Sequence, residues 1–203
     1  HFEFTVDRAH AKAVNQTLTE LRRMQVSAVV FAVILAVGAG FLILLGHTWS
    51  VILGVVLIAG AVSSLWLAFW LPRKMGSVED MYRKSPLVPA VVSELHPRAT
   101  TLLALVDVAK PDTDGSAYAL VTRNIPLLPG QKQRVGDKVP SVALLGDRGT
   151  RSTATTWQMV SPMPIAWGTK DVAVRARAVE AIDKVEWNFL ASKIKESVTV
   201  QKT

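Results

Sequence analysis

Residues 24–71 read MQVSAVVFAVILAVGAGFLILLGHTWSVILGVVLIAGAVSSLWLAFWL, and this stretch decides the fold. It contains no Asp, Glu, Lys or Arg, and its only ionisable side chain is His47. Two apolar runs, residues 26–46 and 51–71, are separated by the four residues 47–50. A helix of about 20 apolar residues crosses the hydrocarbon core of a bilayer, so each run is long enough to span it once. Because the joint is short, the sequence predicts an antiparallel transmembrane hairpin.

Basic residues flank both outer ends of this stretch, whereas the joint carries none. The positive-inside rule therefore places both termini in the cytoplasm of the plasma membrane and the joint outside. Six basic residues are predicted to meet the lipid headgroups on the inner surface: Arg22, Arg23, Arg73, Lys74, Arg83 and Lys84.

Small residues recur every four positions along both runs. They are Ala28, Ala32, Ala36 and Gly40 in the first run, and Gly60, Ser64 and Ala68 in the second. Small residues at this spacing let transmembrane helices approach closely, so these seven positions are predicted to pack helices together. The two stripes could pack on each other inside the hairpin, or one of them could face a helix of another protein. Neither run carries a charge, which argues against a channel, pump or transporter.

The remaining sequence predicts a small soluble domain on the cytoplasmic side. Residues 1–25 read as a short strand followed by an amphipathic helix over 8–25, and residues 72–89 as a linker. Within residues 90–203, short apolar runs alternate with Gly- and Pro-containing turns, a pattern typical of a small antiparallel barrel or sandwich. Residues 171–196 contain no Gly or Pro and predict one amphipathic helix. The predicted fold class is an α+β membrane protein: a transmembrane helical hairpin plus a small, mostly antiparallel β-barrel or sandwich domain closed by a C-terminal α-helix.

Composition excludes several kinds of chemistry. The 203 residues include no Cys, so disulfides, thiolate zinc sites, iron–sulfur clusters and a Cys nucleophile are all absent. The four His, at positions 1, 10, 47 and 96, have no metal-ligand spacing and offer no pair for haem. Neither a triad of His96 with Ser93 or Asp107 nor a phosphate loop over residues 146–152 is supported by its context. The sequence thus predicts no catalytic residue, no cofactor and no metal, and hence a protein that is not an enzyme.

The net charge of +7 bears on possible partners. A basic domain beside a membrane is attracted to anionic lipid. The same charge could serve nucleic-acid binding, but Trp157, Trp167 and Trp187 read as core residues and the domain has few other aromatic side chains. Membrane lipids and other membrane proteins are therefore the predicted partners, and nucleic acid is not.

Three motifs of the β-region carry a resemblance to a known family. They are residues 125–130 (IPLLPG), 139–143 (VPSVA) and 162–169 (PMPIAWGT), followed by Glu186 and Trp187 in the C-terminal helix. With the hairpin before them, they resemble a family of uncharacterised two-span membrane proteins of corynebacteria and related actinobacteria. Chains of this size and topology also look like the accessory subunits of the cytochrome bc–cytochrome oxidase supercomplex of those bacteria.

Two functions follow as hypotheses. The first is a non-enzymatic accessory or scaffold subunit of a larger plasma-membrane complex, with the respiratory supercomplex as the example that the resemblance implies. The alternative is a stand-alone membrane-tethered domain that binds anionic lipid headgroups or a small ligand.

Overall fold

The computed structural model describes residues 2–113, 115–128, 132–149 and 152–201, apart from the side chains at positions 71, 72, 74 and 75. The chain forms two compact units. The hairpin unit comprises residues 17–76. The domain unit combines residues 1–16 with residues 77–203, so the hairpin is an insertion within the sequence of the domain unit.

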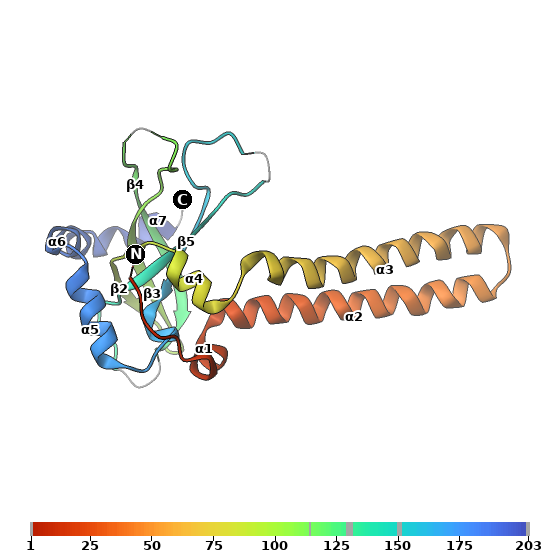
Figure 1. Ribbon diagram of the computed structural model, residues 1–203, viewed down its shortest axis with the longest axis horizontal. Helices are drawn as coiled ribbons and strands as arrows, with labels where there is room; N and C mark the ends of the chain where they lie inside the picture. Colours follow the sequence, from red (N-terminus) through yellow and green to blue (C-terminus); the bar gives the residue numbers. More distant parts are fainter. Residues whose placement is uncertain (1, 114, 129–131, 150–151, 202–203) are drawn as a thin grey trace. The chain divides into compact units, whose positions relative to one another are not determined.

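The hairpin unit consists of two long helices that run side by side in opposite directions (Figure 1). They are α2 (Gln16–Leu44) and α3 (Thr48–Met75). Both are long and apolar enough to cross a membrane. A turn with Gly46 at φ 69° joins them, and the Ser50 hydroxyl donates to the His47 carbonyl over 2.8 Å. The two-helix hairpin predicted from residues 26–71 is therefore present.

The helix predicted over 8–25 is wrong, because two helices share that segment. The first, α1, covers Arg8–Val14, with Asp7 as its N-cap, and ends at Asn15, whose backbone is extended. The second is α2, which starts at Gln16 and continues into the first apolar run. The buried Asn15 side chain donates to the sulfur of Met163 over 3.4 Å, so a contact distant in sequence accompanies the break.

The domain unit contains two three-stranded antiparallel sheets. One has the order β1-β5-β6, formed by Leu87–Val88, Ser141–Gly146 and Met159–Pro164. The other has the order β2-β3-β4, formed by Ala90–Leu95, Ala99–Asp107 and Tyr118–Pro126. Strands β1 and β2 are separated only by Pro89, so one stretch of chain passes from the first sheet to the second. The predicted α+β domain with mostly antiparallel strands is confirmed.

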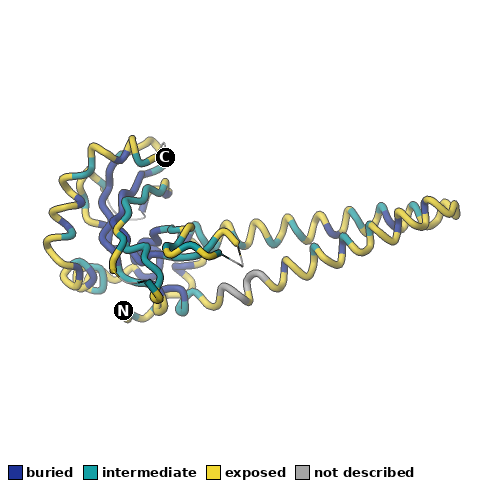
Figure 2. The backbone as a smooth tube through the Cα atoms, turned by 90° about the horizontal axis from the view of Figure 1, so that it is seen from above, coloured by how far each residue is buried: buried dark blue, intermediate teal, exposed yellow. Residues whose placement is uncertain are grey.

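Strand β3 is buried along nearly all of its length because both of its faces are covered. On one face, Ala104 and Val106 pack with Val88 and Ala143 of the other sheet. On the opposite face, Leu103 and Leu105 pack with residues of the C-terminal helical segment, including Ile182, Trp187 and Leu190. The domain thus has a helical layer, a central sheet and a second sheet, and Figure 2 shows buried backbone, in dark blue, inside the domain unit.

The single helix predicted over 171–196 is also wrong. The segment forms α5 (Val172–Ala181), α6 (Lys184–Ser192) and a 3-10 turn, Ile194–Glu196, followed by α7 (Ser197–Gln201). The break falls at Ile182, which is extended and buried, and the Asp183 carboxylate caps the next helix by accepting from the Val185 N–H over 2.9 Å. Asp is a preferred N-cap residue, so it starts a new helix here.

The segment predicted as a linker, residues 72–89, is mostly structured. Helix α3 continues to Met75, and Gly76 ends it with φ 77°. A further helix, α4 (Val78–Lys84), follows directly, and then β1 begins at Leu87. The connection from the hairpin unit to α4 is therefore only residues 76–77.

Candidate functional site

The contact between α2 and α3 follows alternate steps of three and four residues. The buried and half-buried positions that follow this pattern are Leu21, Gln25, Ala28, Ala32, Leu35, Ala39 and Leu42 on α2, and Ser50, Gly54, Leu57, Ala61, Ser64 and Ala68 on α3, and the half-buried Gly38 and Gly60 lie beside them. A seven-residue repeat keeps one seam in contact along two helices that cross at about 20°. Hydrogen bonds cross the seam within the described residues: Ser64 Oγ donates to the Ala28 carbonyl over 3.0 Å, and Gln25 Nε2 donates to the Ala68 carbonyl over 3.0 Å.

Five of the seven predicted packing residues lie in or beside this seam, namely Ala28, Ala32, Gly60, Ser64 and Ala68. Ala36 and Gly40 do not, because both are exposed on α2. A step of four residues turns about 40° beyond a full helical turn, so a four-residue stripe leaves a straight seam after two or three steps. For Ala36 and Gly40 the alternative, contact with a helix of another protein, stays a prediction.

Gly54 is a point of close approach between the two helices that sequence reasoning missed. A Cβ atom placed there would lie 2.8 Å from Ile43 Cγ1 and 3.2 Å from the Ala39 carbonyl oxygen. Gly40, by contrast, has no atom within 4 Å of such a Cβ. Gly54 therefore allows the two backbones to meet.

We expect Gly54→Leu to weaken hairpin packing by about 1–3 kcal/mol, the usual cost of overpacking. The measurement is the SDS fraction at which an Ala28→Cys/Ser64→Cys pair stops crosslinking. The matched control, Gly40→Leu, should leave that fraction unchanged. Equal effects of both substitutions would contradict the assigned seam.

The six predicted membrane-surface residues belong to different units. Arg22, Arg23 and Arg73 are exposed residues of the hairpin unit, whereas Arg83 and Lys84 are exposed residues of α4 in the domain unit. The side chain of Lys74 lies outside the described part of the structure. Arg83 is not free, since its Nη2 pairs with Asp80 Oδ1 at 2.6 Å.

The N-terminal segment (residues 2–15) packs on the domain unit beside α4. Phe4 meets Tyr82 edge-on with ring centroids 5.1 Å apart. The Asp7 N–H donates to the Gly168 carbonyl over 2.8 Å, and His10 Nε2 lies 2.9 Å from the Ala166 carbonyl oxygen. Phe2, Phe4 and Val6 alternate inward as predicted, but residues 2–6 join no strand among the described residues, so the predicted strand is wrong.

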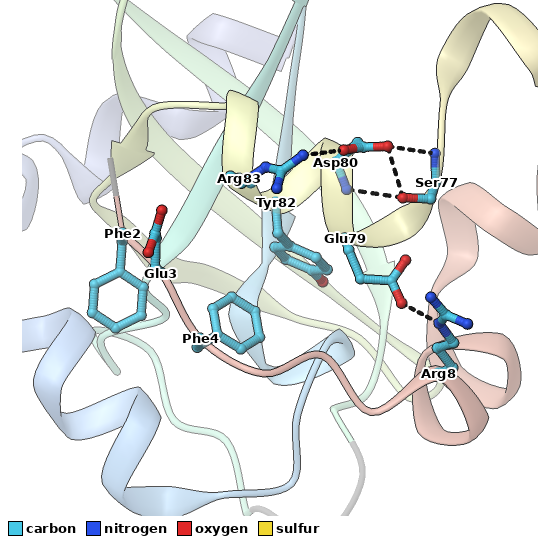
Figure 3. Close-up of a pocket in the computed structure, with 9 residues that line it drawn as sticks. All are labelled: Phe2, Glu3, Phe4, Arg8, Ser77, Glu79, Asp80, Tyr82 and Arg83. Atoms are coloured by element: carbon cyan, nitrogen blue, oxygen red, sulfur yellow. Dashed lines mark hydrogen bonds and ion pairs between the residues drawn. The ribbon is translucent and has the colours of Figure 1, made fainter.

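A polar pocket of about 410 Å³ lies between this segment and α4 (Figure 3). Arg8 forms an ion pair with Glu79 at its edge, and Asp80 pairs with Arg83. Ser77 and Asp80 form a capping box, with Ser77 Oγ accepting from the Asp80 N–H over 3.2 Å. Ser77-x-x-Asp80 is a capping-box spacing readable in the sequence, and it could have identified α4.

The pKa shifts of three pocket residues favour their ordinary charge at neutral pH: Glu79 and Asp80 ionised, and Tyr82 neutral. The hydrogen bond from Arg8 lowers the pKa of Glu79, and the hydrogen bond with the Ser77 hydroxyl lowers the pKa of Asp80. Burial raises the pKa of Tyr82, whose hydroxyl donates to the Pro164 carbonyl over 2.9 Å. General acid–base catalysts work best with a pKa near the operating pH, so these groups suit structure better than proton transfer.

We expect the domain unit to lose stability as the pH falls from 5 to 3. The native pKa values of Glu79 and Asp80 are lowered, so the unfolded chain takes up protons first. Their contribution is present above the ordinary carboxyl pKa of about 4 and is lost as the pH falls through the native values. The check is the melting temperature from pH 7 to pH 3, which should vary less in a Glu79→Gln/Asp80→Asn variant. An unchanged profile in that variant would contradict the assignment.

A second hollow, of about 570 Å³, is lined by residues of both sheets of the domain unit. Pro86, Pro89, Tyr118 and Trp157 are among its walls. Its one carboxylate with a raised pKa is Glu186, and burial is the main cause. No convergent set of ligating groups accompanies it: among the described residues, no three His, Asp or Glu side chains gather as metal ligands.

Ser93, His96 and Asp107, which could be drawn as a catalytic triad from the sequence, each bond to other groups in the structure. Ser93 donates to the Thr101 carbonyl over 3.2 Å, and the Asp107 carboxylate accepts the N–H groups of Ala109 and Ala117. Among the described residues His96 forms no hydrogen bond with either of them, and its Nε2 lies 3.2 Å from Thr101 Oγ1 and 3.6 Å from Glu94 Oε2. Strand β5 ends at Gly146, where residues 146–152 begin. Asp147 of this segment forms an ion pair with Lys110, with Nζ and Oδ2 2.8 Å apart. His1 and Arg151 lie outside the described residues.

Comparison with known proteins gives a family and a related structure. Residues 73–197, more than half of the chain, match the family described as "Protein of unknown function (DUF3239)". The fold is similar to a crystal structure of a candidate membrane protein from Corynebacterium diphtheriae, with 37% sequence identity and a TM-score of 0.54. That similarity covers 58% of this chain and 94% of the other. No curated protein matches the chain. On the strength of the 73–197 match, this membrane protein belongs to the DUF3239 family.

Proposed function

We propose that this chain is a non-enzymatic accessory subunit of a larger plasma-membrane complex. In this proposal the hairpin crosses the membrane twice, both termini are cytoplasmic, and the domain unit lies at the cytoplasmic surface. One observation carries the proposal: the domain unit is assembled from the chain segments before and after the hairpin.

Because segments before and after the hairpin share one unit, the chain between them must cross the membrane an even number of times. The N-terminal segment precedes the hairpin, yet Asp7 and His10 bond to the carbonyls of Gly168 and Ala166, which follow it. Segments folded into one unit must lie on one side of a bilayer, so both ends of the hairpin emerge there. The Lys and Arg at those ends favour the cytoplasmic side.

The connections at the two ends of the hairpin are also short. Only Asn15 separates α1 from α2, and only residues 76–77 separate α3 from α4. A chain spans at most about 3.5 Å per residue, so the domain is tied near the bilayer at two points. A single span with a long linker would suffice for anchoring alone, whereas two short ties suit a domain that meets a neighbour in the membrane.

The outward side of the hairpin supports a protein neighbour. Its own seam uses mostly small side chains, and large ones such as Phe31, Val37 and Phe41 are more than half exposed. Ala36 and Gly40 lie among them and would let a partner helix approach closely. The lack of charge in either span makes transport by this chain alone a poor alternative.

A photocrosslinking amino acid at Ala36 in the native membrane tests the proposal. We expect a discrete product with an integral membrane protein, reduced at least several-fold by Gly40→Trp. The same label at His47, in the turn, is the matched control and should not give this product. Lipid adducts alone, together with a monomer after gentle detergent extraction, would contradict the proposal.

The first complex to test is the cytochrome bc–cytochrome oxidase supercomplex, because the chain resembles its accessory subunits in size and topology. Purification through a tag on this chain should then bring haem absorbance with it. A crosslinked partner without haem would still support the accessory role, but it would show that the complex is not this supercomplex.

A further inference from the structure

We propose that α3 carries a binding groove for one anionic glycerophospholipid of the cytoplasmic leaflet. The groove has a volume of about 420 Å³ and is lined by Val62, Leu65, Trp66, Phe69, Trp70 and Arg73. All six belong to the hairpin unit, and none lies in the seam between α2 and α3. The inference rests on the membrane topology proposed above, but it is independent of the protein partner.

The walls of the groove are apolar and directed away from the hairpin seam. Val62, Trp66 and Phe69 are 61%, 59% and 58% exposed. Trp66 and Trp70 stack with ring centroids 5.2 Å apart and an interplanar angle of 17°, which makes one wall flat and rigid. A flexible acyl chain can follow such a wall, and tryptophan is enriched where a span meets the headgroups.

The length of the groove fits one leaflet. Val62 and Arg73 are eleven residues apart on α3, a rise of about 16 Å along the helix. The hydrocarbon core is about 30 Å thick, so one leaflet contributes about half of it. With Arg73 at the headgroups, Val62 lies close to the depth that an acyl chain of the same leaflet reaches.

Charge selects an anionic headgroup. Arg73 closes the groove at one end, and Arg22 and Arg23 lie at the same end of the hairpin, because Gln25 of α2 bonds to Ala68 of α3. Glu20 lies one turn before Arg23 on α2, whereas α3, which carries Arg73, contains no acidic residue. Arginine binds phosphate through several N–H donors, so Arg73 is placed to hold the lipid phosphate.

The test uses the full chain with Trp49→Phe in phosphatidylcholine vesicles, so that Trp66 and Trp70 are the tryptophans of the hairpin unit. Brominated phosphatidylglycerol or brominated phosphatidylcholine is added as a quencher, and relative binding constants are read from the fluorescence. We expect phosphatidylglycerol to bind about fivefold more tightly, the effect of one basic contact near the surface. Arg73→Gln should bring the ratio close to one.

The matched control is Arg23→Gln, which removes the same charge from the same end of the hairpin but does not line the groove. It should keep most of the preference. Equal quenching by the two lipids in the parent chain, or equal losses in both variants, would overturn the proposal, since the attraction would then be absent or diffuse. The purified chain carries no protein partner, so the result is separate from the crosslinking test.

Discussion

Replacing Trp167 by alanine is expected to lower the free energy of unfolding of the domain unit by about 3–5 kcal/mol, the cost of removing a large buried aromatic side chain. Trp167 is only 1% exposed, and it ends the 3-10 turn η1 (Ile165–Trp167). The guanidinium carbon of Arg123 lies 5.2 Å from its ring centroid, and Arg123 Nη1 donates to the Pro162 carbonyl over 3.0 Å. Alanine would leave a cavity where β4, β6 and this turn meet.

The measurement is the thermal unfolding of the full chain in detergent, where the melting temperature should fall by roughly 10 °C or more. Trp157→Ala is the matched control, because Trp157 is half-buried and Lys110 Nζ lies 5.2 Å from its ring centroid. Trp157→Ala should lower the melting temperature clearly less than Trp167→Ala does. If the two variants have the same melting temperature, Trp167 is not the core residue that the structure shows.

The second large effect is expected from Gly168→Val, which should release the N-terminal segment from the domain unit. A Cβ atom at Gly168 would lie 2.8 Å from Tyr82 Cε2 and 3.0 Å from Phe4 Cζ. Its φ of −95° is open to any residue, so the effect is steric. Overpacking costs about 1–3 kcal/mol, and Phe4 is the ring that can move away.

Hydrogen exchange of the peptide over residues 2–15 measures this release. In the parent chain the Asp7 N–H is bonded to the Gly168 carbonyl, so its exchange should be slow, and it should become fast in Gly168→Val. Gly149→Val serves as the control, since no atom of the described residues lies within 4 Å of a Cβ placed there. Unchanged exchange in Gly168→Val would show that the segment does not depend on this contact.

The hairpin was accessible from sequence because its signal is local, and hydropathy alone identifies residues 26–71. The alternation of short apolar runs with turns likewise predicted a mostly antiparallel β-region, but it did not predict the order of the strands in the two sheets. Strand β6 was hardest to recognise, because Met159–Pro164 contains Pro162 and Pro164, which argue against a strand. They are tolerated because β6 is at the edge of its sheet in the order β1-β5-β6.

The candidate sites were harder to predict, because they depend on contacts distant in sequence. Nothing near Phe4 or Asp7 indicates that these residues pack against Tyr82 and Gly168. The seam was only partly predicted, since alanine and glycine are so frequent in α2 that repeats of four and of three and a half residues both fit. The groove on α3 follows only once the seam is known, because the seam defines which face is left outward.

The central claim is that residues before and after the hairpin form one unit on one side of the membrane. Because the chain has no Cys, single cysteines can be placed at Lys12, Thr48 and Ser116 and labelled with a membrane-impermeant maleimide. In inverted vesicles the account predicts labelling at positions 12 and 116 and protection at 48, with the reverse in intact cells. Labelling of positions 12 and 116 from opposite sides would contradict it.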